Sequence, residues 1–241
     1  MFIESIKNEK IKNIKKLNTK KYREEKGLFL IEGEHLVLEA SKNNILEEVL
    51  ILDGYDILVN CKKTYVSGSV LKYISELDNF PKYIGICKKL EEKELGKKIV
   101  ILDEIQDPGN LGTIIRSSVA FNIDTIILGK NCVDLYNSKV LRASQGMIFN
   151  INIIEKDLNK YIPYLKNNNY KIYGTKVNGG KSLKNVEKSS KFAIIMGNEG
   201  TGVKEEILSM CDEYLYIDMN KKCESLNVGV ATSIILYELD K

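Results

Sequence analysis

From residue 99 onward, short apolar runs alternate with helical stretches in a regular order. The runs rich in Ile, Val and Leu predict strands at 99–103, 125–128, 151–154, 171–174, 192–196 and 214–217. Helices are expected between them near 112–121, 138–143, 157–168 and 203–210, with a last one at 227–239. Near-continuous apolar strands separated by helices are typical of a parallel sheet covered on both faces. The pattern therefore predicts an α/β domain over 98–241.

The first 92 residues predict a second, smaller α/β domain. Apolar residues recur at helical spacing over 3–17, which indicates a basic amphipathic helix there. Further strands are expected at 28–31, 49–52 and 83–87, and further helices after Gly33 and over 69–77. The polar stretch 91–98 contains a glycine and is the expected linker between the two domains.

The charge of the chain is distributed unevenly. The formal net charge is only +3, but residues 1–26 carry nine Lys and Arg against four Glu, which gives +5 in that segment. A basic arm of this kind fits either a phosphate-contacting element or a solvated helix face, and both interpretations stay open. Because the chain has no Trp, base stacking would fall to Tyr or Phe.

Several classes of function are disfavoured by composition. The five cysteines lie far apart without a CxxC pair, which argues against a disulfide framework or a zinc site. The one histidine, His35, lies on an expected amphipathic helix and is interpreted as structural. No apolar run reaches the roughly 20 residues of a membrane span, and the charged N-terminus does not resemble a signal peptide. We therefore expect a cytoplasmic protein without a metal site or a membrane segment.

Three polar, glycine-containing loops each follow a predicted strand: 107–116, 196–202 and 224–231. In open parallel sheets, ligands bind at the carboxyl ends of strands, so we expect these loops to converge on one composite site. Each loop carries side chains with no evident role in a core, namely Asn110, Arg116, Asn198, Glu199, Ser225 and Asn227.

The first loop is expected to be a turn followed by a helix, with Arg116 about one turn into that helix. A guanidinium in an otherwise apolar helix needs a carboxylate or phosphate partner. A structural ion pair and an RNA contact are both compatible with this position.

The second and third loops also have alternative interpretations. The glycines of 197–202 match neither the dinucleotide fingerprint nor the P-loop, so the carboxylate of Glu199 between them indicates another function. Ser225 or Asn227 is expected to cap the last helix. The N-terminus of that helix would also present free N–H groups to a cofactor carboxylate or an RNA phosphate.

Taken in order, these segments resemble the three motifs of the SpoU (TrmH) family. DEIQDPGNLGTIIRSS resembles the first motif, IIMGNEGTGV the second and IDMNKKCESLNVGVATSIILYE the third. The resemblance covers 99–241, and the first 90 residues resemble the L30-like RNA-binding domain common in this family, through GLFLIEG at 27–33. One departure is Asp218, where the family usually has Pro; we expect a local backbone change and added charge near the cofactor.

The resemblance implies an S-adenosylmethionine-dependent RNA ribose 2′-O-methyltransferase, with 23S rRNA as the expected substrate. It also implies a SPOUT domain with a parallel sheet and a deep trefoil knot over 98–241, an RNA-binding domain over 1–92, and a homodimer. Matched to the motifs, the expected catalytic residues are Arg116, Asn110, Glu199, Ser225 and Asn227. The expected cofactor-binding residues are Gly197, Ile217, Leu226, Thr175 and Met219.

The family proposal makes the motif-one arginine a base, but arginine is essentially never deprotonated in proteins. We therefore expect Arg116 to position the ribose and its adjacent phosphate. Three other functions remain as alternatives: a tRNA ribose 2′-O-methyltransferase, a non-catalytic RNA-binding or ribosome assembly factor on the same fold, and a nucleotide-binding α/β enzyme. The missing phosphate fingerprints disfavour the last of these.

Overall fold

The computed structural model describes residues 2–187 and 189–240, which form two compact units. The first unit comprises the chain up to Glu91 together with Asp134–Asn150, and the second comprises Glu92–Val133 and the chain from Ile151 on. The chain first passes from one unit to the other between Glu91 and Glu92, within the expected linker 91–98. No helix in the described residues is long and apolar enough to cross a membrane.

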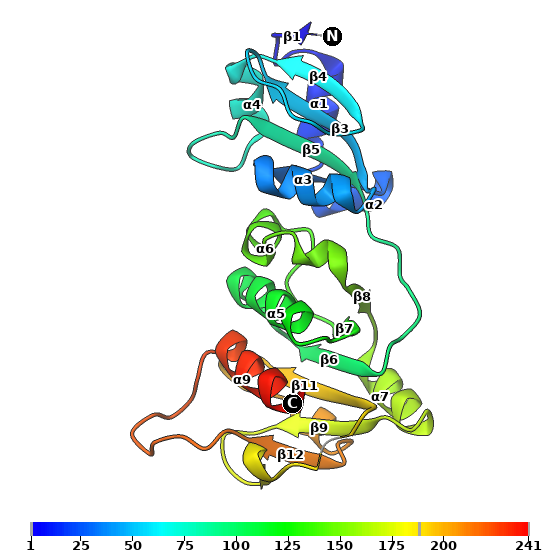
Figure 1. Ribbon diagram of the computed structural model, residues 1–241, viewed down its shortest axis with the longest axis vertical. Helices are drawn as coiled ribbons and strands as arrows, with labels where there is room; N and C mark the ends of the chain where they lie inside the picture. Colours follow the sequence, from blue (N-terminus) through cyan, green and yellow to red (C-terminus); the bar gives the residue numbers. More distant parts are fainter. Residues whose placement is uncertain (1, 188, 241) are drawn as a thin grey trace. The chain divides into compact units, whose positions relative to one another are not determined.

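The first unit contains a five-stranded mixed sheet (Figure 1). Across the sheet, the strands are β1 (Phe2–Ile3), β4 (Lys62–Val66), β3 (Leu46–Leu52), β5 (Tyr83–Lys88) and β2 (Leu28–Glu32). β1, β4 and β3 run parallel, and β5 is antiparallel to β3 and β2. The three predicted strands are confirmed as β2, β3 and β5. β4 was not predicted, because Lys-Lys-Thr-Tyr-Val contains no continuous apolar run.

The helices of the first unit differ from the prediction at the N-terminus. They are α1 (Glu9–Lys16), α2 (Lys20–Lys26), α3 (Glu34–Lys42), α4 (Gly68–Ile74) and α6 (Ser138–Ser144), with a 3-10 turn at Met147–Asn150. The predicted helix over 3–17 is wrong at its start, because the Asn8 side chain caps α1 by accepting the N–H of Lys10 at 2.9 Å. α2 was also missed, and it ends at Gly27 in the left-handed conformation with φ of 64°.

The segment 134–150 lies between two strands of the second unit in sequence but packs in the first. Arg23, which is 6% exposed, forms an ion pair with Asp134. The rings of Phe29 and Tyr136 have centroids 4.6 Å apart. His35 Nε2 lies 3.1 Å from the carbonyl oxygen of Gln145, at the end of α6, so this histidine has a structural contact.

The second unit contains a seven-stranded sheet in which neighbouring strands run parallel. Across the sheet, the strands are β10 (Lys181–Ser182), β12 (Glu213–Tyr216), β9 (Lys171–Thr175), β11 (Phe192–Gly197), β6 (Lys98–Asp103), β7 (Thr125–Leu128) and β8 (Asn152–Glu155). The six predicted strands are confirmed, and the two-residue β10 is an addition at the edge. The predicted α/β architecture with a parallel sheet is therefore correct.

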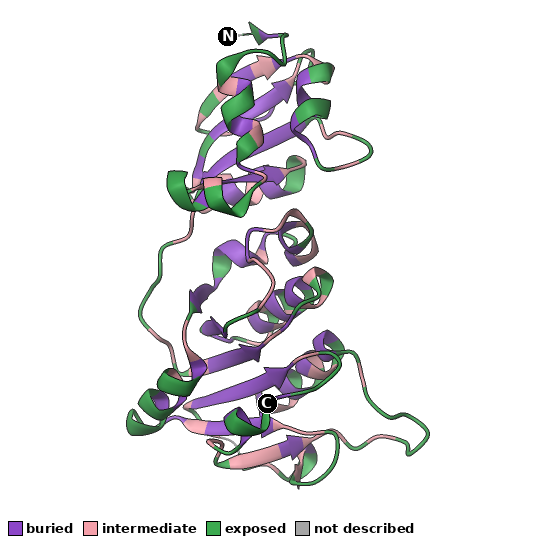
Figure 2. Ribbon diagram, turned by 180° about the vertical axis from the view of Figure 1, so that it is seen from behind, coloured by how far each residue is buried: buried purple, intermediate pink, exposed green. Residues whose placement is uncertain are grey.

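Helices cover both faces of this sheet (Figure 1). They are α5 (Pro108–Ala120), α7 (Leu158–Asn167), α8 (Glu205–Leu208) and α9 (Val228–Asp240), with a 3-10 turn at Leu183–Asn185. One core cluster joins α7 and α8 to odd-numbered strand residues such as Ile99, Ile101 and Ile195. Side chains alternate along a strand, so in β6 and β11 the even-numbered residues lie on the other face of the sheet. Figure 2 shows the strands buried and the outer sides of the helices exposed.

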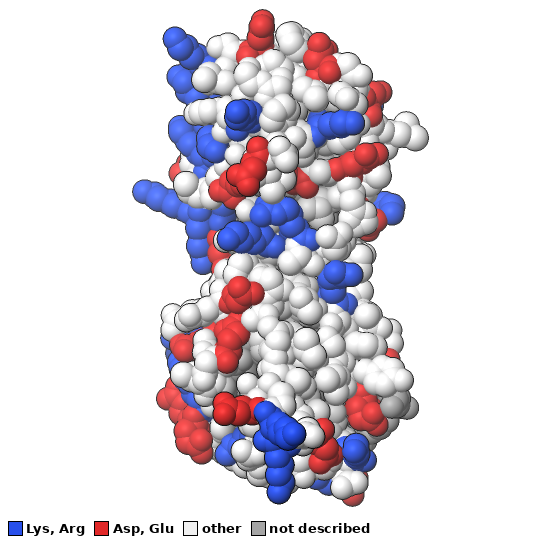
Figure 3. Space-filling model, turned by 90° about the vertical axis from the view of Figure 1, so that its left-hand side faces the viewer, with Lys and Arg blue, Asp and Glu red and all other residues white. Residues whose placement is uncertain are grey.

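Charged side chains differ between the units on the face drawn in Figure 3. On the first unit, in the upper part of the picture, Lys and Arg atoms are numerous and Asp and Glu atoms lie among them. The second unit presents a broad area without charged side chains on that face.

Candidate functional site

A pocket of about 800 Å³ lies in the second unit at the carboxyl ends of β9, β11 and β12. This is the edge at which parallel sheets bind ligands. Nine of the ten residues proposed from the sequence line it: Asn110, Thr175, Gly197, Glu199, Ile217, Met219, Ser225, Leu226 and Asn227. Arg116 is the exception. The three motif loops therefore meet at one pocket.

The first motif is a helix N-terminus rather than a turn before a helix. Asp107 caps α5 by accepting the N–H of Asn110 at 2.8 Å, and Pro108 occupies the first helical turn. Proline is favoured there because its missing N–H would have no intrahelical partner. The helix thus starts four residues earlier than predicted, so Arg116 lies more than two turns into it rather than one.

The second motif forms a tight loop that is organised by Asn198. The backbones of Asn198 and Gly202 exchange two hydrogen bonds, of 3.0 and 2.9 Å. The Asn198 side chain accepts the N–H groups of Gly200 and Thr201 at 2.9 and 3.2 Å. A Cβ on Gly197 would lie 2.1 Å from the backbone of Gly202, so only glycine allows this closure. Because these N–H groups are occupied inside the loop, the segment is not a phosphate cradle.

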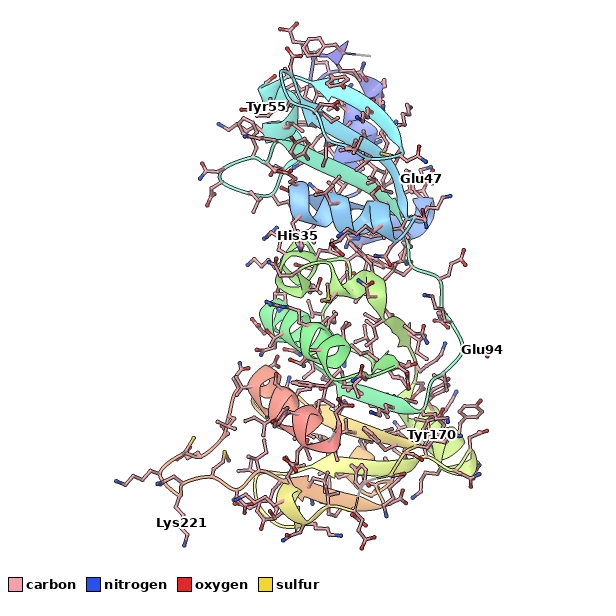
Figure 4. The ribbon with its side chains drawn as sticks, in the orientation of Figure 1. His35, Glu47, Tyr55, Glu94, Tyr170 and Lys221 are labelled. Atoms are coloured by element: carbon pink, nitrogen blue, oxygen red, sulfur yellow. The ribbon has the colours of Figure 1, made fainter. Side chains whose placement is uncertain are left out.

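The third motif ends in the cap of α9. Asn227 Oδ1 accepts the N–H groups of Gly229 and Val230 at 2.9 and 3.3 Å. Asn227 rather than Ser225 is therefore the capping residue. The prediction of free N–H groups at this helix end is wrong for these two positions, because the cap uses them. The loop before the cap extends outward, with Lys221 at its far end (Figure 4).

Asn110, Glu199 and Asn227 form a continuous chain of hydrogen bonds. Asn110 Nδ2 donates to Glu199 Oε1 at 2.9 Å, and Asn227 Nδ2 donates to Asn110 Oδ1 at 2.8 Å. A carboxylate only accepts and a backbone N–H only donates, so the two ends of this chain fix the orientation of both amides. One side chain from each motif thus holds the three loops together.

Glu199 is kept ionised by its donors. Burial acts to raise its pKa, but the hydrogen bond from Asn110 and backbone N–H groups, including those of Asp107 and Gln106, outweigh burial and hold the pKa below its usual range. At neutral pH the group is therefore a carboxylate that accepts from three directions.

Helices α5 and α9 lie side by side and run in the same direction. Contacts join Thr113 to Gly229, Ser117 to Ser233 and Phe121 to Tyr237, each four residues further along both helices. The shared register places the two helix N-termini together, where Asn110 meets Asn227.

Arg116 is exposed on α5 and does not line the pocket. Among residues 2–187 and 189–240 it has neither a hydrogen-bond nor an ion-pair partner. The structural ion pair considered from the sequence is thus absent from the described part of the chain. Since Cα–Cβ bonds in a helix tilt toward its N-terminus, the Cβ atom of Arg116 is directed toward the end of α5 that carries Asn110.

Asp103 supports the second motif loop and was not singled out by the sequence analysis. It ends β6, is 4% exposed, and accepts the N–H of Lys204 at 2.9 Å, which anchors the far end of the second loop. Burial raises the pKa of Asp103 above its usual value. The sequence did contain a signal for Asp103, because a carboxylate at the carboxyl end of a central parallel strand lies at the edge where such sheets bind ligands.

Asp218, the departure from the family pattern, has a partner across the sheet edge. It accepts a hydrogen bond from Ser182 Oγ at 2.5 Å, and Lys184 Nζ lies 3.9 Å away. Asp218 stands between two pocket residues, Ile217 and Met219. The added charge is therefore compensated locally.

The chain belongs to the SpoU rRNA methylase family. Residues 97–237 match the SpoU rRNA Methylase family, and residues 8–84 match the MRM3-like substrate binding domain. The first match covers the second unit with its pocket and three motifs. The resemblance inferred from the motifs is thus confirmed, and it defines an S-adenosylmethionine-dependent RNA methyltransferase.

Individual relatives extend over both units. The chain is 39% identical over 243 residues to the 23S rRNA (guanosine(2553)-2′-O)-methyltransferase RlmP of Bacillus subtilis (strain 168), with 98% of each chain covered. The structure of AdoMet-bound rRNA methyltransferase from Sinorhizobium meliloti superposes with a TM-score of 0.87 at 26% identity, covering 99% of this chain and 97% of that chain. The A. aeolicus TrmH/SpoU tRNA modifying enzyme covers 61% of this chain and 76% of its own, with a TM-score of 0.55 at 26% identity.

The pocket fits the family's cofactor. Its volume of about 800 Å³ lies within the range of small-molecule sites. Apolar side chains such as Leu215, Ile217 and Leu226 offer walls for an aromatic base, and the loops around them bring backbone polar groups to the same space. This combination suits S-adenosylmethionine, which carries an adenine ring and several polar groups.

Replacing Glu199 by Gln is expected to loosen the three loops. Both oxygens of Glu199 accept hydrogen bonds, so the NH₂ group of Gln would face an N–H donor in either orientation. At least one of these hydrogen bonds would therefore be lost. We expect the free energy of unfolding in urea to fall by about 1 kcal/mol and methyl transfer to fall at least about tenfold. Glu206→Gln, on the exposed surface of α8, is the matched control. Equal losses in the two variants would contradict this role.

Replacing Asp103 by Asn is expected to stabilise the protein more at high pH than at low pH. A carboxyl whose folded pKa is raised binds its proton more tightly in the folded state, so stability is lost as pH rises through the folded pKa. Asn keeps an acceptor for Lys204 N–H without the charge. The Tm of the variant minus that of the wild type should be larger at pH 8 than at pH 4. The same difference at both pH values would show that the carboxyl is not shifted.

Proposed function

We propose that this chain transfers a methyl group from S-adenosylmethionine to a ribose 2′-hydroxyl of 23S rRNA. The observation that carries the proposal is the hydrogen-bonded chain from Glu199 through Asn110 to Asn227. It joins the three family motifs at a pocket of suitable size, with the exposed guanidinium of Arg116 on the same helix as Asn110. A non-catalytic RNA-binding factor would have no need of this arrangement.

Ribosomal RNA is favoured over tRNA by the extent of the similarities. The rRNA enzymes of B. subtilis and S. meliloti match both units, whereas the tRNA modifying enzyme matches 61% of the chain. The first unit, which matches a substrate binding domain, is shared with the rRNA enzymes. Its basic segment 1–26 supplies charge for RNA phosphates.

In this proposal Arg116 holds the substrate. The cofactor supplies a methyl group on a sulfonium, which is already activated, so the protein has to align the 2′-oxygen and stabilise the charge that develops on it. A guanidinium stays charged at working pH and binds phosphate through two parallel N–H groups. Arg116 has no partner in the described chain and is therefore available for the ribose and its adjacent phosphate.

The three hydrogen-bonded residues position the site. With three donors on its oxygens, Glu199 orients Asn110 rather than serving as a base. Asn110 in turn orients Asn227, which caps α9. Ser225, Gly197, Ile217, Leu226, Thr175 and Met219 complete the pocket that we assign to the cofactor.

We also propose a homodimer formed through α9. Val230, Ile234 and Tyr237 recur at helical spacing on this helix and are 46%, 38% and 54% exposed. Large apolar side chains on one helix face are typical of an interface. A dimer through this helix would bring the RNA-binding groups of two chains to one substrate.

Other implications of the resemblance stay predictions. These are the deep trefoil knot, the cytoplasmic location, and the assignment of 1–92 and 98–241 as the RNA-binding and methyltransferase domains. The segment 134–150 packs with the first unit, so we propose that it contributes to the RNA-binding part of the protein. No three His, Cys, Asp or Glu side chains in the described ranges gather as a metal site.

The function is tested by transfer of labelled methyl to unmodified 23S rRNA and to tRNA. We expect ribose-linked label in 23S rRNA with the wild type and at least a hundredfold slower transfer with Arg116→Ala, because a phosphate-binding charge is lost. Arg116→Lys should restore part of the rate, since it keeps the charge but not the two parallel donors. Label found in tRNA alone would contradict the substrate, and full activity of Arg116→Ala would contradict the role of Arg116.

The dimer is tested by light scattering during gel filtration. The wild type should elute at twice the monomer mass. Ile234→Asp places a charge in the apolar stripe and should yield monomers, whereas Leu58→Asp, at an exposed apolar residue of the first unit, should not change the mass. A wild type that is monomeric at micromolar concentration would rule out the proposed interface.

A further inference from the structure

The first unit has a groove of its own, between its N-terminal helices and its sheet. It has a volume of about 620 Å³, and its residues come from α1, α2 and all the strands except β1. The floor is apolar, with Ile14, Leu17 and Ile86 each less than one tenth exposed. One wall is the ring of Tyr22, which is partly exposed. The catalytic pocket in the second unit shares none of these residues.

Ammonium groups surround the Tyr22 ring. Lys16 Nζ and Lys26 Nζ lie 5.5 and 5.4 Å from its centroid. Lys16 also donates to Asn13 Oδ1, at 3.0 Å, and both of these lysines are exposed. Lys26 Nζ also forms an ion pair with Glu25, at 3.0 Å. Because the cation–π contacts and this ion pair lie at the surface, they hold the two cations only modestly. They can therefore be drawn to a stronger anionic partner.

The opposite rim of the groove also has an excess of positive charge. Lys10 and Lys62 share a single carboxylate, that of Glu48, with Lys62 at 3.5 Å. Burial acts to raise the pKa of Glu48, but its contacts with Lys10, Thr64 and Lys62 outweigh burial and keep the pKa below its usual value. Two ammonium groups on one ionised carboxylate leave one positive charge at this rim, and the other carboxylate of the groove, that of Glu47, is paired with Lys88 at 2.8 Å.

We propose that this groove binds an unpaired nucleobase of the substrate RNA, stacked on Tyr22, with the flanking phosphates on the lysines. The inference rests on the proposed function only in taking RNA as the substrate. An aromatic wall and an apolar floor suit the faces of a base, and RNA is recognised chiefly through bases that are splayed out and stacked on aromatic rings. On binding, the base takes the ring face, and Lys16 and Lys26 turn to the phosphates. A base inside a duplex cannot enter such a groove.

The test uses the full-length protein and a single-stranded RNA decamer with 2-aminopurine at its centre. Stacking on Tyr22 should quench the 2-aminopurine fluorescence with the wild type and with Tyr22→Phe, which keeps the ring. Tyr22→Leu should abolish the quench and weaken binding about tenfold, the usual effect of losing one stacked base. A 12-base-pair RNA duplex should bind without depending on Tyr22.

Two controls separate stacking from general damage. Tyr55 is also exposed, and Lys82 Nζ lies 4.1 Å from its ring centroid. Figure 4 shows Tyr55 on the opposite side of the unit from the groove residue Glu47. Tyr55→Leu should leave both quench and affinity unchanged. Lys26→Gln should reduce the slope of log affinity against log salt by about one, whereas Lys42→Gln on α3 should not.

The outcomes also distinguish this proposal from the proposed function. In methyl-transfer assays, Tyr22→Leu should raise the KM for 23S rRNA and leave the KM for S-adenosylmethionine unchanged. A quench that persists in Tyr22→Leu, or equal losses in Tyr22→Leu and Tyr55→Leu, would overturn the groove assignment even if methylation is normal. Absence of methyl transfer with a Tyr22-dependent quench would count against the proposed function alone.

Discussion

The site depends on one directional chain of hydrogen bonds. It starts at the ionised carboxylate of Glu199, passes through the amides of Asn110 and Asn227, and ends at the N-terminus of α9. The two intermediate positions need a group with both a donor and an acceptor, and the side-chain amides of Asn110 and Asn227 supply both. Each residue lies in a different motif. The chain therefore explains why three segments far apart in sequence have to occur together.

Much of the fold could be predicted because burial leaves a clear pattern. The strands of the second unit are covered on both faces and read as continuous apolar runs, whereas β4 is half exposed and gave no such signal. The convergence of the loops followed from the position of strand ends. The start of α5 was misjudged because Asp107–Asn110 has the composition of a turn, and only the cap geometry distinguishes the two. The packing of 134–150 with the first unit depends on tertiary contacts such as Arg23 with Asp134.

Two kinds of polar side chain can be distinguished: those whose hydrogen-bond partners lie within the protein and those available to a substrate. Asn110, Glu199 and Asn227 have their hydrogen-bonding capacity largely used within the protein, so they fix geometry. Arg116 has no partner in the described chain and is available to the substrate. The lysines around Tyr22 are held by exposed cation–π contacts and, for Lys26, by a surface ion pair with Glu25, and we propose that RNA phosphates replace these contacts. In this proposal, Arg116 of the second unit and the groove of the first unit both contact the RNA, and methyl transfer takes place in the second unit.

The most direct measurement is a map of ribose 2′-O-methylation in ribosomal RNA from cells with and without this gene. We predict that one ribose methyl group in 23S rRNA disappears on deletion, returns with the wild-type gene, and does not return with Arg116→Ala. An unchanged 23S rRNA pattern, or full restoration by Arg116→Ala, would contradict the account.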